Sequence, residues 1–234
     1  IDHQPKGRHK RFDEKVLKSL ESLTQGSPAD VLFEAALALN AAPLKEIVTK
    51  SRLEASIAEE ALKELISNGQ LIILENGAQS ITSDTLAIAL PHWNGLQDRV
   101  IQITEAYHKD MPLRRGIPRE ELKSKLKITP RIFNSAITLL VKQNSVLEVG
   151  KSVSHPGHEI KFNGADQLKV KELIRKFESN PYGGPSVKEC QNEVGEEIVN
   201  ALIELGELVT VSQDVIFRKK DYDEMVKKFR AEIQ

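Results

Sequence analysis

The densest group of side chains able to bind another molecule is a cationic segment from Pro112 to Arg131. It holds seven Arg and Lys residues against two glutamates, a net charge of +5 in a chain whose overall charge is −1. Such a local excess of cations attracts the phosphate groups of nucleic acid. The alternative is a solvated charged surface. The candidate binding residues are Arg114, Arg115, Arg119, Lys123, Lys127, Arg131 and Lys142.

Two further features refine this hypothesis. Arg119, Lys123 and Lys127 are spaced four residues apart, so they are expected on one face of a helix whose Leu122 and Leu126 point inward. A second basic patch, net +3 over residues 1–11, is formed by Lys6, Arg8, Lys10 and Arg11.

Residue patterns for catalysis or for metal binding are weak. His155 and His158 have two residues between them and lack a second His or Cys pair, so a polar loop is favoured over a metal site. Gly183 and Gly184 precede a proline and lack the sequence context of a phosphate-binding loop. Cys190 is the only cysteine, which excludes an internal disulfide and fits a reducing compartment. We therefore predict no catalytic residue, no metal and no cofactor in this segment.

The elements that position the cations follow from an internal repeat. Apolar residues at helical spacing are followed by a stop residue and then by a strand-like run, and this pattern occurs three times, over residues 61–74, 136–149 and 198–211. Gly69, Asn144 and Gly206 occupy the stop, where left-handed dihedral angles are favoured.

Further elements are expected around each repeat. A shorter helix opening on a proline precedes it, at Pro43–Ser51, Pro118–Lys127 and Pro185–Val194, and a longer helix precedes that, at Ala29–Leu39, Leu86–Lys109 and Gln167–Ser179. Hairpins follow, with turns near residues 75–78, 150–157 and 212–214. Three helices and a two-stranded wing are the order of the winged helix-turn-helix unit.

The predicted fold is therefore mainly α with small β-wings (α+β), a tandem array of three winged helix-turn-helix domains. The expected divisions are a basic leader at 1–25, winged helices at 26–84, 85–163 and 164–220, and the start of a truncated fourth unit at 221–234. Because the chain begins at Ile1 without a methionine, it is expected to be a piece of a longer protein. Trp93 lies in register with Leu96, Val100 and Ile103 and is assigned a packing role.

Charge distinguishes the three units. The third helix of the first unit, Ala55–Ser67, has a net charge of −2, and the segment Lys188–Glu207 of the third unit has a net charge of −5. Both are expected to repel phosphate, which leaves the second unit as the candidate binding surface. No apolar run is long enough to span a bilayer, so a cytoplasmic protein is expected. It is also expected to be a monomer.

The segment Tyr107–Leu126 resembles the second winged-helix unit of bacterial selenocysteine-specific elongation factors (SelB). The similarity is carried by His108, Pro112-Leu113-Arg114, Gly116 and Arg119-Glu120-Glu121-Leu122, and the leader Arg8–Ser27 is similar to the junction after the elongation-factor-Tu-like domains of that family.

This resemblance implies a role in recoding UGA as selenocysteine on the ribosome. The segment would link a body that binds GTP, with Mg, and selenocysteyl-tRNA to a fourth winged helix that grips the SECIS hairpin of the mRNA, both outside this sequence. Weak contact with tRNA or ribosomal RNA is then expected from the second unit. The alternatives are a tandem winged-helix DNA-binding transcription regulator and a protein–protein scaffold.

Overall fold

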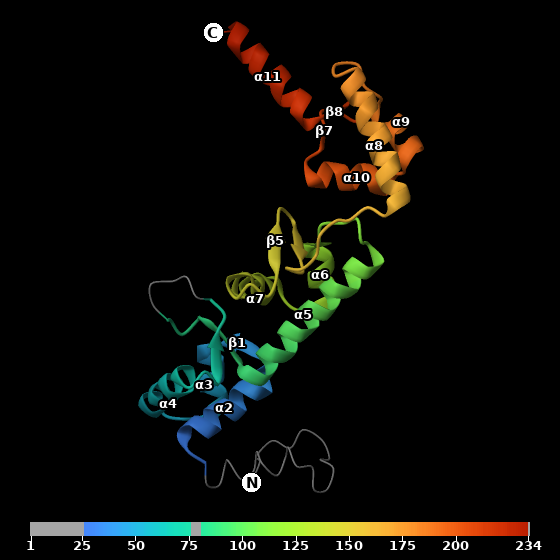
Figure 1. Cartoon of the computed structure of the whole chain (residues 1–234). Coiled ribbons are helices and arrows are strands. Elements are labelled where there is room, and N and C mark those ends of the chain that lie inside the picture. The colour runs from blue at the N-terminus through green and yellow to red at the C-terminus, as the bar shows by residue number, and fades with distance from the viewer. Residues whose placement is uncertain (1–25, 76–80, 234) are drawn as a thin grey trace. The chain divides into compact units, whose positions relative to one another are not determined.

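The computed structural model describes residues 26–75 and 81–233 (Figure 1). It is mainly α-helical with small antiparallel sheets, the composition of winged-helix proteins. The order helix, helix, helix and β-hairpin occurs three times along the chain. None of the helices in this described part combines the length and the apolar content that a bilayer-spanning helix requires.

The chain forms two compact units. One contains the described residues up to Val100 together with Lys127–Gln143, and the other contains Ile101–Leu126 and the described residues from Asn144 onward. The division into three winged helices with cuts at 84 and 163 remains a prediction.

The first repeat comprises α2 (Pro28–Leu39), β1 (Ala41–Pro43), α3 (Leu44–Ser51), α4 (Ala55–Ser67), β2 (Leu71–Ile73) and β3 (Leu86–Ala89). Ser27 begins α2 with a capping box, because its hydroxyl accepts from the Asp30 amide while the Asp30 carboxylate accepts from the Ser27 amide. The apolar faces of α2, α3 and α4 pack with the sheet into one core around Leu32, Ile47 and Leu65.

The sheet of this repeat corrects one predicted element. Residues Leu86–Ala89 were expected to begin a long helix, but they form β3, the central strand in the order β1-β3-β2. Ala42 pairs with Ala87, and Ile72 pairs with Ile88. All four β3 residues are buried, and a short continuous apolar run of this kind does not reveal from its periodicity whether it is strand or helix.

The second repeat comprises α5 (Leu90–Asp110), β4 (Ile117–Pro118), α6 (Arg119–Leu126), α7 (Pro130–Lys142), β5 (Leu147–Val149) and β6 (Ser152–Ser154). Its sheet has the order β4-β6-β5, with Glu148 opposite Val153. Gly150 has a φ of 61° between the two hairpin strands, so the turn is tighter than expected from 150–157. Trp93 is 3% exposed, which confirms its packing role.

The third repeat comprises α8 (Gly164–Ser179), α9 (Val187–Val194), α10 (Glu196–Leu205), β7 (Leu208–Thr210) and β8 (Ile216–Arg218), and α11 (Lys219–Ile233) follows it. Its core gathers the buried faces of α8, α9 and α10 around Leu173, Phe177 and Leu202. The ring of Phe177 lies so close to Gly184 that a Cβ there would be 2.6 Å from it, which gives this glycine a packing role.

The backbone confirms the predicted stop residues. Gly69, Asn144 and Gly206 have φ angles of 69°, 55° and 79°, the left-handed conformation that closes a helix. Each therefore turns the chain from the end of a third helix toward the strand that follows.

Candidate nucleic-acid interface

Arg114 and Arg115 lie in the loop between α5 and β4. At the end of this loop Gly116 meets the second wing so closely that a Cβ would be 2.5 Å from the Val153 carbonyl oxygen. Glycine is therefore required at 116, because any side chain would push the loop away from the strand. The loop backbone is held further by His158, whose Nε2 lies 2.9 Å from the Arg114 carbonyl oxygen.

The side chain of Arg114 is held by two glutamates of α10. Its Nη2 and Nε lie 2.9 and 3.2 Å from the two carboxylate oxygens of Glu197, and its Nη1 lies 3.6 Å from Glu204 Oε1. Hydrogen bonding to Glu197 raises the pKa of Arg114 further above its already high usual value. A phosphate that binds Arg114 must compete with both carboxylates.

Arg115 also contacts α10. Its amide donates to Glu204 Oε2 at 2.7 Å, and its Nη1 donates to the Glu204 carbonyl oxygen at 3.1 Å. The acidic α10 of the third repeat therefore binds part of the basic loop. Both segments belong to the same compact unit.

The cations of α6 are also engaged. Arg119 forms an ion pair with Glu148 of β5, Lys123 pairs with Glu120, and Lys125 Nζ lies 3.2 Å from Glu121 Oε1. Exposed pairs of this kind contribute little to stability, so their lysine and arginine side chains can exchange one anion for another at low cost.

Lys127 does not share the α6 face as expected. The helix ends at Leu126, and Lys127 has a φ of 55°, so it leaves the helical spacing that relates Arg119 to Lys123. A left-handed residue after the last turn ends a helix, and the following Thr129-Pro130 begins α7.

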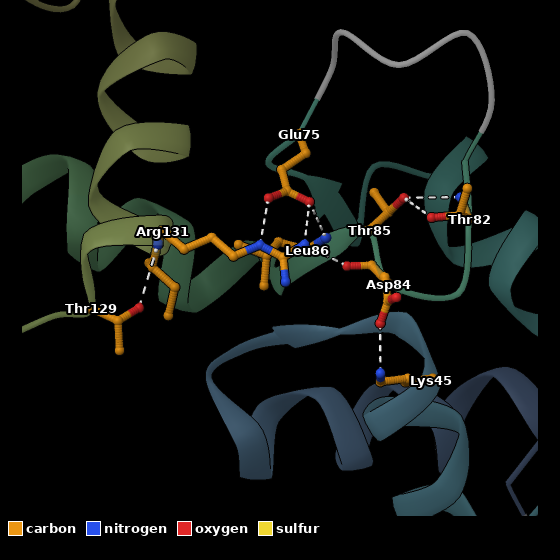
Figure 2. A network of polar contacts seen from close by, with 9 residues as sticks. Lys45, Glu75, Thr82, Asp84, Thr85, Leu86, Thr129 and Arg131 are labelled. Carbon is orange, nitrogen blue, oxygen red and sulfur yellow. Dashed lines mark hydrogen bonds and ion pairs between the residues drawn. The ribbon is translucent and has the colours of Figure 1, made fainter.

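Arg131, at the start of α7, is bound to the first wing (Figure 2). Its Nε and Nη2 each lie 2.8 Å from one carboxylate oxygen of Glu75, and Nη2 also donates to the Asp84 carbonyl oxygen at 2.7 Å. Glu75 in addition accepts the Leu86 amide at 3.0 Å, and the Asp84 carboxylate pairs with Lys45 at 2.6 Å. The hydrogen bonds from Arg131 lower the pKa of Glu75. Arg131 thus holds Glu75, which follows β2, and Asp84, which precedes β3.

The seven candidate residues are divided between the two compact units. Arg114, Arg115, Arg119 and Lys123 belong to one compact unit, whereas Lys127, Arg131 and Lys142 belong to the other. Lys127 and Lys142 are exposed. The second basic patch, Lys6, Arg8, Lys10 and Arg11, lies outside the described residues.

A histidine cluster is the main feature that the sequence analysis missed. His108, near the end of α5, is 8% exposed, and its ring stacks on His158 with a centroid distance of 3.6 Å. Its Nε2 accepts the His155 amide at 3.1 Å, so Nδ1 carries the proton of the neutral ring and is buried without a partner among the described residues. Burial, together with the neighbouring His158 and His155, lowers the pKa of His108 to about 4.

The cluster ties the end of the second wing to α5. Among the described residues no group of three or more His, Cys, Asp or Glu side chains is arranged to hold a metal ion. The His108 and His158 rings form a stacked packing contact between α5 and the segment that follows the second wing. His108 and His158 are 50 residues apart in the sequence, so spacing did not predict this cluster. The only sequence signal was the position of His108 in the segment Tyr107–Leu126.

The repeated three helices and antiparallel hairpin, with a cationic loop and α6 in the second repeat, define a winged-helix protein. Residues 101–154 match the family described as "Elongation factor SelB, winged helix". A curated relative from Desulfomicrobium baculatum, named "Selenocysteine-specific elongation factor", is 23% identical over 239 residues, which cover 97% of this chain and 36% of the relative. The chain thus spans about a third of that relative's length. Residues 101–154 are thus similar to a winged helix of that family, and the chain as a whole is similar to part of one selenocysteine-specific elongation factor.

Proposed function

We propose that this chain is the C-terminal arm of a selenocysteine-specific elongation factor. It links a body that binds GTP and selenocysteyl-tRNA to a tip that binds the SECIS hairpin, and so serves the recoding of UGA to selenocysteine on the ribosome in the cytoplasm. The observation that carries this proposal is the family match over residues 101–154, where the cationic loop, Gly116 and α6 lie. The chain itself has a non-catalytic, monomeric role in this proposal.

The ion pairs between Arg114 and α10 support a mechanical role. Arg114 and Arg115 contact Glu197 and Glu204, residues more than 80 positions further along the chain. Such bidentate and backbone contacts fix orientation more than they add free energy of folding. If binding at one end of a linking arm is to affect the other end, the parts of the arm must keep a fixed orientation.

We also propose that α6 and the adjacent loop contact tRNA or ribosomal RNA weakly through the phosphate backbone. The supporting observation is that every cation of α6 pairs with an exposed or partly exposed carboxylate, which RNA phosphates can replace. No aromatic side chain accompanies these cations in α6, so sequence readout is not expected.

The test replaces cationic side chains with alanine, so no new negative charge is placed beside the glutamates of α10. In the variant Arg115→Ala/Arg119→Ala/Lys123→Ala, affinity for tRNA is expected to fall at least about tenfold, and the dependence of log K on log salt to flatten by about 2. The matched control, Lys63→Ala/Lys176→Ala/Lys219→Ala, removes three ion-paired cations elsewhere and should bind like the unmodified chain. Equal binding by both variants would contradict the RNA contact and favour a scaffold.

A further inference from the structure

A shallow hollow beside α8 combines apolar and cationic side chains. Its volume is about 390 Å³, and its lining residues are Phe162, Gln167, Val170, Lys171, Ile174, Arg175 and Glu178. Phe162, Val170 and Ile174 form an apolar floor, half-buried against the core of the third repeat. The hollow lies entirely within one compact unit and is open to solvent.

The rim of this hollow carries uncompensated positive charge. Glu178 is bound to Arg218, with 2.5 Å between Oε1 and Nη1, so it does not neutralise the hollow. Lys171 and Arg175 are exposed one helical turn apart, and in the part of the chain that the structure describes neither forms an ion pair. The Gln167 amide nitrogen donates to the Phe162 carbonyl oxygen at 3.0 Å, which holds the Phe162 backbone against α8 and leaves the Gln167 amide oxygen as an acceptor.

The dimensions of the floor select one kind of partner. Val170 and Ile174 are separated by four residues, about 6 Å along the helix axis. An amphipathic peptide helix needs anchors repeated over two or more turns, which this floor does not offer. A single planar ring does fit, and an unstacked nucleobase is a ring whose flanking phosphates are anionic.

We propose that this hollow is a subsite for one unstacked nucleotide of single-stranded RNA. The base packs on Phe162 and on the aliphatic floor, while Lys171 and Arg175 bind the adjacent phosphates. The subsite is separate from α6 and does not depend on the proposed linking role. It also gives the third repeat an RNA-binding surface on α8, although its α9–α10 segment is acidic.

The test uses the whole chain and a labelled twelve-nucleotide single-stranded RNA. Lys171→Ala/Arg175→Ala should weaken binding at least about tenfold and flatten the slope of log K against log salt by about 1.4. Phe162→Leu keeps an apolar floor but removes the ring, and a loss of at least about fivefold is expected from lost stacking. The control Lys50→Ala/Lys109→Ala removes two exposed lysines outside the hollow and should change binding less than twofold.

Photocrosslinking locates the contact independently of folding effects. A 4-thiouridine version of the RNA should crosslink within residues 162–178, and an RNA duplex of the same sequence should not. Crosslinks confined to other segments, unchanged affinity in Lys171→Ala/Arg175→Ala, or tighter binding of an acidic peptide than of RNA at this site would each overturn the proposal. Loss of binding only in the α6 variant would retain the proposed function and reject this subsite.

Discussion

Replacing Leu202 by alanine is expected to lower the free energy of unfolding by about 2–5 kcal/mol. Leu202 is 2% exposed and packs within the core formed by α8, α9 and α10, so truncation removes buried apolar contacts and leaves a cavity. Leu65 and Leu140 hold the corresponding positions of α4 and α7 and are also fully buried, so Leu65→Ala and Leu140→Ala should have effects of the same size.

Urea unfolding followed by far-ultraviolet circular dichroism measures these changes, and Trp93 fluorescence reports on the unit that contains Leu65. Leu168→Ala provides the matched control, because Leu168 lies on α8 with 66% of its surface exposed and should lose less than about 1 kcal/mol. If Leu202→Ala lowers the free energy of unfolding no more than Leu168→Ala does, the core formed by α8, α9 and α10 is misassigned.

Acidification is expected to destabilise the histidine cluster. The pKa of His108 is lowered from 6.5 to about 4 in the folded chain, so the folded state keeps the ring neutral while the unfolded state binds a proton below pH 6.5. The stability that depends on neutral His108 is therefore complete above pH 6.5 and declines as the pH falls toward 4. At pH 5 the loss amounts to about 2 kcal/mol.

The measurement is urea unfolding of the unmodified chain and of His108→Gln at pH 7 and pH 5. Glutamine keeps an acceptor near the His155 amide but does not titrate, so the decline from pH 7 to pH 5 should be smaller in this variant. The remaining titrating groups are shared by both chains and cancel in the difference. An identical decline in both chains would mean that His108 does not carry the pH dependence.

Local sequence patterns were sufficient for most of the fold. Helical periodicity located the third helices, and the stop residues followed from the need for positive φ, which Gly69, Asn144 and Gly206 satisfy. The strand Leu86–Ala89 was missed because four consecutive apolar residues fit a buried strand and a buried helix equally well, and only pairing with β1 and β2 decides between them.

The candidate interface was less predictable, because its partners are remote in sequence. Summing charges over Pro112–Arg131 identified a basic segment but did not indicate that Glu197 and Glu204, from the acidic α10, would bind Arg114. The same applies to Arg131 and Glu75, which lie 56 residues apart. Spacing rules describe neighbours within one helix and carry no information about such long-range pairs.

We propose that this chain is a linking arm whose RNA contacts do not read sequence. The most direct test is titration of the chain with a selenocysteine-insertion hairpin and with a scrambled hairpin of equal length, each at low and at high salt. We predict equal affinity for both RNAs and a steep loss of binding with salt. Tight binding confined to the selenocysteine-insertion hairpin would contradict this role, as would the absence of RNA binding at low salt.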